Sequence, residues 1–100
     1  MRHAKRVDDN HGAIRDALRR VPGVRVYDSS GCGRGLPDLL VTHRHALFFV
    51  ELKDGTKAPS ARRLTPAEAE FKAFVSTALG VSYEVVESVE QALRLVGVRP

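Results

Sequence analysis

The sequence contains few of the residues that mark several common classes of protein. Its single cysteine, Cys32, excludes an internal disulfide and any cysteine-rich zinc site, and it favours a reducing cytoplasm. The absence of tryptophan and the presence of only two tyrosines argue against an extended aromatic surface for stacking single-stranded nucleic acid. The longest apolar run, residues 46–50, is far too short to cross a membrane. The basic N-terminal residues are not followed by a hydrophobic segment, so we expect no secretion.

Acidic residues are outnumbered, with 12 Asp and Glu against 16 Lys and Arg, and the net charge is +4. A basic surface favours an anionic partner, most often nucleic acid, but the same charge also occurs on soluble proteins that bind no nucleic acid. The chain has 100 residues, of which 43% are hydrophobic and 28% charged, as is typical of one globular domain. We therefore expect a single domain over residues 1–100.

Hydrophobic periodicity predicts the element order αβββαβα. Asp8, Asp9 or Asn10 is expected to begin the first helix, because short polar side chains cap exposed N–H groups. The predicted elements are helices over about 14–21, 66–79 and 88–96 and strands over 24–27, 38–42, 46–53 and 83–86.

The start of the second helix has a clear local pattern. Thr65 occupies the capping position, Pro66 suits the first helical position and Glu68 completes a capping box. The helix is expected to bury an apolar face made of Ala67, Phe71, Phe74, Val75 and Ala78.

Two acids and a lysine form the most informative pattern in the chain. Asp38 follows a turn, and Glu51 and Lys53 lie two residues apart on an apolar strand, so they share one face of it. Two carboxylates can hold a divalent metal, and an ammonium beside them can position a water next to a phosphodiester. The alternative is a solvated strand face with a surface ion pair, worth about 0–1 kcal/mol.

These residues carry a resemblance to a known family. Pro37-Asp38 followed by Glu51-x-Lys53 resembles the PD-(D/E)xK nuclease signature. From about residue 8 to residue 95, the chain is similar to the VRR-NUC (virus-type replication-repair nuclease) branch, specifically its small stand-alone phage and bacterial members. The segments that carry this likeness are Gly35-x-Pro37-Asp38-Leu39-Leu40, Val50-Glu51-Leu52-Lys53 and Leu64-Thr65-Pro66.

The resemblance implies a fold and an activity. The fold is α/β, a restriction-endonuclease-like αβββαβ core with a mixed central sheet flanked by helices. The activity is that of a Mg²⁺- or Mn²⁺-dependent endodeoxyribonuclease. Asp38, Glu51 and the backbone carbonyl of Leu52 would bind the metal, and Lys53 would orient the attacking water or stabilise negative charge. Gly35 would let the backbone approach a ligand.

The sequence departs from the family pattern at two positions. His11 stands where the family commonly has a glutamate on the first helix. One possibility is that His11 binds metal or substrate directly, and another is that Asp8 on the same helix face acts through water. The alternative is a histidine at the helix start with no role in the site. Glu68 stands where the family often has glutamine, and it either adds a third carboxylate or serves only the capping box.

The resemblance also implies partners. Stand-alone members act as homodimers on branched DNA, so we expect a homodimer that cuts Holliday-junction-like structures in the cytoplasm of a bacterial host. The alternatives are a nicking or flap nuclease that depends on a partner, a DNA-binding module whose nuclease site has lapsed, and a basic scaffold that binds no nucleic acid. The expected DNA contacts are Arg34, Lys57, Arg62 and Arg63, the alternative for each being a solvated surface charge.

Overall fold

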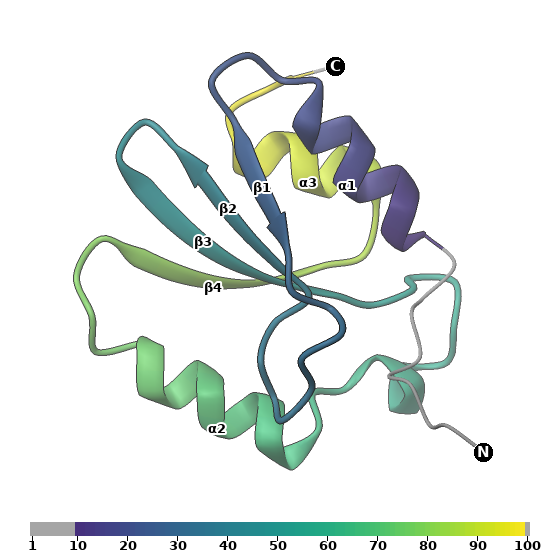
Figure 1. Ribbon diagram of the computed structural model, residues 1–100. Helices are drawn as coiled ribbons and strands as arrows, with labels where there is room; N and C mark the ends of the chain where they lie inside the picture. Colours follow the sequence, from purple (N-terminus) through teal and green to yellow (C-terminus); the bar gives the residue numbers. More distant parts are fainter. Residues whose placement is uncertain (1–9, 100) are drawn as a thin grey trace.

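The computed structural model describes residues 10–99, and within them the predicted order of helices and strands is confirmed (Figure 1). The loop after the third strand contains, in addition, a short 3₁₀ helix. The elements are α1 (His11–Arg19), β1 (Arg25–Asp28), β2 (Leu39–His43), β3 (Ala46–Leu52), η1 (Pro59–Arg62), α2 (Pro66–Val75), β4 (Val81–Val86) and α3 (Val89–Leu95).

The four described strands form one mixed sheet in the order β1-β2-β3-β4. β1 pairs antiparallel with β2 and β2 with β3, whereas β3 and β4 are parallel. The β2–β3 hairpin turns at Arg44 and His45, whose φ angles of 51° and 69° suit a tight two-residue turn between twisted strands. The parallel pair requires a longer connection, which η1 and α2 provide.

The hydrophobic core lies between the sheet and the helices α1 and α3. These helices pack against each other on one side of the sheet, and α2 lies on the opposite side (Figure 1). Because side chains alternate along a strand, every second residue of β2 and β3 enters this core. The fully or almost fully buried apolar side chains include Ile14, Leu18, Leu39, Val41, Val50, Leu52 and Val86.

The opposite face of the sheet is only partly covered. Phe71 of α2 packs edge-on against Phe49, with ring centroids 5.2 Å apart, and Val75 is buried. The predicted burial of Phe74 is wrong, because its side chain is 75% exposed. Ala67 and Ala78 are also exposed, and α2 packs mainly along β4.

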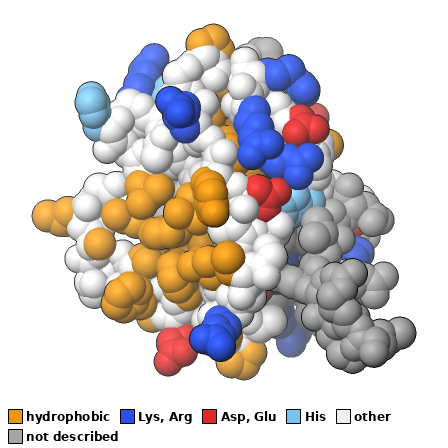
Figure 2. Space-filling model, in the orientation of Figure 1, with side chains coloured by type: hydrophobic (Ala, Val, Ile, Leu, Met, Phe, Trp, Pro, Cys, Tyr) orange, Lys and Arg blue, Asp and Glu red, His pale blue; other side chains and the backbone are white. Residues whose placement is uncertain are grey.

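Consequently, an apolar patch is open to solvent on this side of the molecule (Figure 2). Two hollows of about 350 Å³ and 330 Å³ lie on it, one along β1 and β2 and one beside α2. We refer to Tyr27, Leu40, Leu47, Phe71 and Phe74, which line these hollows, as the apolar patch.

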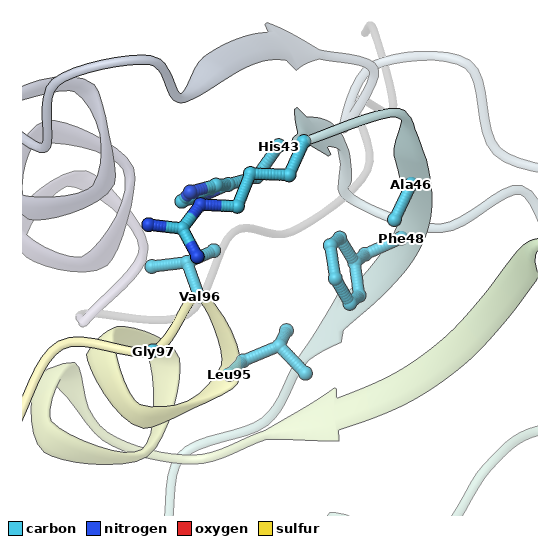
Figure 3. Close-up of a pocket in the computed structure, with 7 residues that line it drawn as sticks. His43, Ala46, Phe48, Leu95, Val96 and Gly97 are labelled. Carbon is cyan, nitrogen blue, oxygen red and sulfur yellow. The ribbon is translucent and has the colours of Figure 1, made fainter.

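A further hollow of about 280 Å³ lies on the side of the sheet that α1 and α3 cover, between the β2–β3 hairpin and the end of α3 (Figure 3). Phe48 and Leu95 face each other across it, and His43 lies at the hairpin end. It lies at the N-terminal end of β3, whereas Glu51 lies near the C-terminal end of that strand. No helix among the described residues is both long and apolar enough to span a bilayer.

Candidate active site

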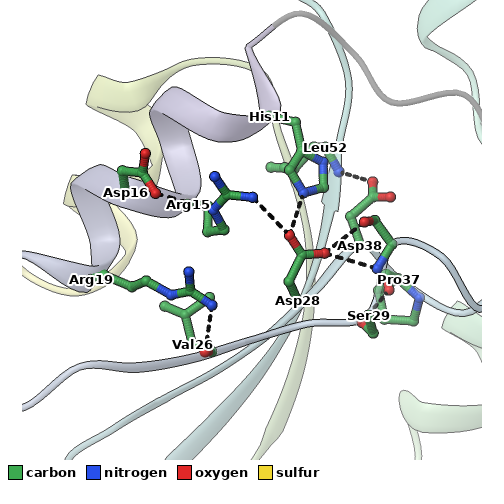
Figure 4. Close-up of polar contacts among 11 residues, drawn as sticks. His11, Arg15, Asp16, Arg19, Val26, Asp28, Ser29, Pro37, Asp38 and Leu52 are labelled. Atoms are coloured by element: carbon green, nitrogen blue, oxygen red, sulfur yellow. Dashed lines mark hydrogen bonds and ion pairs between the residues drawn. The ribbon is translucent and has the colours of Figure 1, made fainter.

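Asp38 is held rigidly just before β2 begins. Its carboxylate Oδ2 accepts a hydrogen bond of 2.9 Å from the backbone N–H of Leu52, and its carbonyl oxygen accepts one of 2.9 Å from Ser29 (Figure 4). The β2–β3 register pairs Leu39 with Val50, so extending it by one residue places Asp38 opposite Glu51. Directly opposed residues have Cβ atoms about 5 Å apart, so the two acids are neighbours on one face.

Gly35 packs closely against the backbone of α2. Its φ is +81°, and a Cβ at this position would lie 2.3 Å from the carbonyl oxygen of Ala67. The glycine therefore allows the loop before Asp38 to pack tightly against the first turn of α2, while its expected approach to a ligand stays a prediction.

Glu51, Lys53 and Glu68 form a buried charged cluster. Their exposed fractions are 2%, 9% and 7%. Lys53 Nζ lies 3.0 Å from Glu68 Oε1 and 3.5 Å from Glu51 Oε2. The alternative of a solvated surface ion pair is therefore wrong, while the expectation that Glu51 and Lys53 share a face is confirmed.

Glu68 both caps α2 and contacts Lys53. Its Oε1 accepts a hydrogen bond of 2.9 Å from the N–H of Thr65, and Thr65 Oγ1 accepts one of 3.2 Å from the N–H of Glu68. The capping box is thus confirmed, and the view that Glu68 serves only the cap is wrong, because the same oxygen also accepts from Lys53.

The cluster alters the ionisation of its members. Burial opposes the charge on Lys53, but the hydrogen bond to Glu68 and the nearby Glu51 outweigh it and raise the pKa of Lys53. Burial likewise opposes ionisation of Glu68, yet hydrogen bonds from Thr65 and Lys53 lower its pKa. In this structure Lys53 is therefore a protonated hydrogen-bond donor to Glu68.

His11 is buried against an acid that sequence reasoning missed. Its Nε2 lies 3.1 Å from Asp28 Oδ2, and Arg15 donates to the same oxygen at 3.1 Å (Figure 4). Burial raises the pKa of Asp28, but hydrogen bonds from Ser30, His11 and Arg15 together bring it far below the usual range. The one sign of this acid in the sequence is that Asp28 is followed by Ser29 and Ser30. An Asp at the start of such a turn often accepts a hydrogen bond from the backbone two residues later. Asp8 lies outside the described residues.

Asn10 connects the start of α1 with the site. It occupies the capping position but makes no side-chain cap. Its amide instead donates to the carbonyl oxygens of Lys53 at 3.2 Å and Glu87 at 3.1 Å, which are at the ends of β3 and β4. Asn10, one of the residues predicted to cap the helix, therefore links the start of α1 to the ends of β3 and β4 beside Lys53.

The four basic residues expected to bind DNA lie in different settings. Lys57 and Arg63 are exposed on the loop that follows Lys53. Arg62 is half-buried, donating to the carbonyl of Lys57 at 2.8 Å and pairing with Glu87 at 3.3 Å, so it orders the loop. Arg34 is exposed beside α2, on the other side of Asp38 in the chain.

The donor set suits a hard divalent cation, because Asp38 and Glu51 offer neighbouring carboxylate oxygens. Lys53 contacts Glu51 in the same cluster, and no group of three or more His, Cys, Asp or Glu side chains within residues 10–99 is arranged to hold a metal. No family model, curated protein or solved structure matches the chain. The resemblance to the VRR-NUC branch therefore rests on the motif residues of the sequence and stays a prediction.

Proposed function

We propose that this chain is a metal-dependent DNA endonuclease of the VRR-NUC type with a restriction-endonuclease-like fold. The observation that carries the proposal is the burial of Asp38, Glu51 and Lys53 together at one end of the sheet. Burying charges costs several kcal/mol per ion, and an apolar cluster of similar volume would often be as stable. A buried set of this kind is therefore better explained by chemistry than by stability.

Asp38, Glu51 and the carbonyl oxygen of Leu52 are the proposed ligands of Mg²⁺ or Mn²⁺. The Leu52 N–H already donates to Asp38, and in an extended strand the N–H and C=O of one residue face the same neighbour. When bound, the metal would lower the pKa of a water and offset the charge that develops on a phosphodiester.

Lys53 and Glu68 have distinct proposed roles. The Lys53 ammonium, which stays protonated, donates hydrogen bonds to the attacking water or to the phosphate oxygens. Glu68 holds that ammonium at 3.0 Å, and the cap at Thr65 holds Glu68. The position of Lys53 therefore depends on the first turn of α2.

The exposed Lys57 and Arg63 are proposed to contact DNA phosphates beside the site, and Arg34 from the other side. We further propose that a second copy of the chain covers the apolar patch, because contiguous exposed apolar surface commonly marks an interaction site. A symmetric dimer would carry two sites suited to a branched, Holliday-junction-like substrate. The exposed Cys32 suits a reducing cytoplasm.

One observation favours a second candidate function, a DNA-binding module whose nuclease site has lapsed. The Lys53 ammonium lies 3.5 Å from Glu51, and in residues 10–99 no three metal-binding side chains are gathered. A partner-dependent nicking or flap nuclease is the related alternative, in which another protein would complete the site.

Cleavage of a labelled four-way junction in Mg²⁺ or Mn²⁺, with linear duplex as the comparison, tests the proposal. Wild type should cut the junction, and Lys53→Ala should lose at least about a hundredfold in rate because an electrostatic donor is removed. Lys72→Ala, which removes an exposed lysine of α2, is the matched control and should keep full activity. Salt-sensitive DNA binding without cleavage in either metal would instead support the lapsed module.

A further inference from the structure

The hydroxyl of Tyr83 is an unexplained polar group beside the proposed active site. It is buried, and no described residue forms a hydrogen bond with it. An unsatisfied buried hydroxyl destabilises the fold, so such a group calls for a functional or structural reason.

Two contacts place Tyr83 next to the charged cluster. The β3–β4 register pairs Tyr83 with Phe49, so Glu51 is its diagonal neighbour on the same face of the sheet. Its ring centroid lies 6.3 Å from that of Phe71, which is one helical turn from Glu68 on α2. Tyr83 therefore lies between the sheet and α2, on the side of the carboxylates.

The surroundings keep this hydroxyl protonated. Burial, followed by the negative charges of Glu51, Glu68 and Asp38, raises the pKa of Tyr83 above its ordinary value. A phenol with a pKa at or above its ordinary value of about 10 is protonated at neutral pH, so this hydroxyl can donate a hydrogen bond.

We propose that Tyr83 is a positioning residue that donates a hydrogen bond to Glu51 when a divalent metal is bound. The inference rests on the proposed function. Lys53 is closer to Glu68 than to Glu51, and a cation bound by Glu51 would repel the ammonium towards Glu68. Carboxylates that ligate metals are regularly held by an outer hydrogen bond, and the Tyr83 hydroxyl is a buried donor on the same face of the sheet as Glu51.

Tyr83→Phe separates this role from a structural one, because it removes the hydroxyl and keeps the ring against Phe71. We expect the metal-free variant to melt at the same temperature as wild type or higher, since the lost hydroxyl had no partner. We expect its Mn²⁺ affinity, measured by calorimetry and by the rise in melting temperature with Mn²⁺, to fall about tenfold. Ser60→Ala, which removes an exposed hydroxyl of η1 outside the charged cluster and the apolar patch, should match wild type in both measurements.

Two outcomes for Tyr83→Phe would overturn the inference. Unchanged Mn²⁺ affinity would show that the hydroxyl does not support the metal ligand. A lower melting temperature without metal would show that it has a structural partner. If wild type itself bound no Mn²⁺, both the proposed function and this inference would fail. If wild type bound Mn²⁺ and Tyr83→Phe bound it equally well, the proposed role of Tyr83 alone would be rejected.

Discussion

Glu68 offers the sharpest test of how the fold positions the charged cluster. One oxygen of this side chain accepts hydrogen bonds from the Thr65 N–H at 2.9 Å and from Lys53 Nζ at 3.0 Å. Glu68→Ala removes both, and among the ion pairs within residues 10–99 it leaves the buried ammonium with the 3.5 Å contact to Glu51. Thr65→Ala breaks the capping box and leaves the Lys53 contact in place.

The expected losses of stability follow from these contacts. Removing one partner of a buried ion pair costs about 3–5 kcal/mol, and the remaining Glu51 contact places Glu68→Ala at the lower limit, about 3 kcal/mol. Thr65→Ala should cost about 1 kcal/mol, the usual value of a helix cap. Glu68→Gln keeps one amide oxygen that can accept from both donors but loses the charge, so its cost should be about 1–2 kcal/mol.

Urea unfolding at pH 7, followed by circular dichroism, measures these differences in the free energy of unfolding. The control is Glu70→Ala, at an exposed position of the same helix, and its stability should lie within about 0.5 kcal/mol of wild type. The pKa of Glu68 is lowered by folding, so its charge stabilises the protein above the ordinary value of 4.5 and this contribution is lost as pH falls below it. The gap between wild type and Glu68→Gln should therefore narrow in acid. A cost for Glu68→Ala no larger than that for Thr65→Ala would refute the reasoning.

Three further predictions concern other parts of the structure. Gly35→Ala should destabilise the protein by at least about 1–2 kcal/mol, measured by urea unfolding, because φ is positive and the added methyl would meet the Ala67 carbonyl. Asp28→Ala should cost about 1–3 kcal/mol by the same assay, because His11 is buried and loses its acceptor. Phe74→Glu, in the apolar patch, should shift the mass measured by light scattering from that of a dimer to that of a monomer. It should not lower the melting temperature of the monomer, because the Phe74 side chain is exposed within one chain.

Each of these has a result that would contradict it. Gly31→Ala, where a methyl would meet open space, is the control for Gly35, and equal stability of the two variants would reject the close-packing argument. The contribution of Asp28 should disappear as pH falls below its ordinary pKa of 3.8, so a cost that persists undiminished in acid would exclude an electrostatic origin. A wild-type protein that is monomeric at all concentrations would rule out the second copy on the apolar patch.

Local patterns were sufficient to predict several parts of the site. The pleat of a strand places residues two apart on one side, so Glu51 and Lys53 had to share a face wherever β3 formed. The capping box needs only Thr65 and Glu68, three residues apart, and it forms as predicted. The order of elements followed from the same short-range periodicities.

Only the tertiary structure decided which of these groups meet. Lys53 and Glu68 are brought together by the packing of α2 against the sheet, and His11 and Asp28 by the packing of α1, over separations of 15 and 17 residues. Phe74 is the opposite case, because its spacing on α2 indicated burial but its side chain is 75% exposed. The spacing of residues along a helix or strand indicates which side chains lie on the same face, because the direction of each side chain depends on local backbone geometry. What covers that face depends on how distant segments pack, which no local pattern contains.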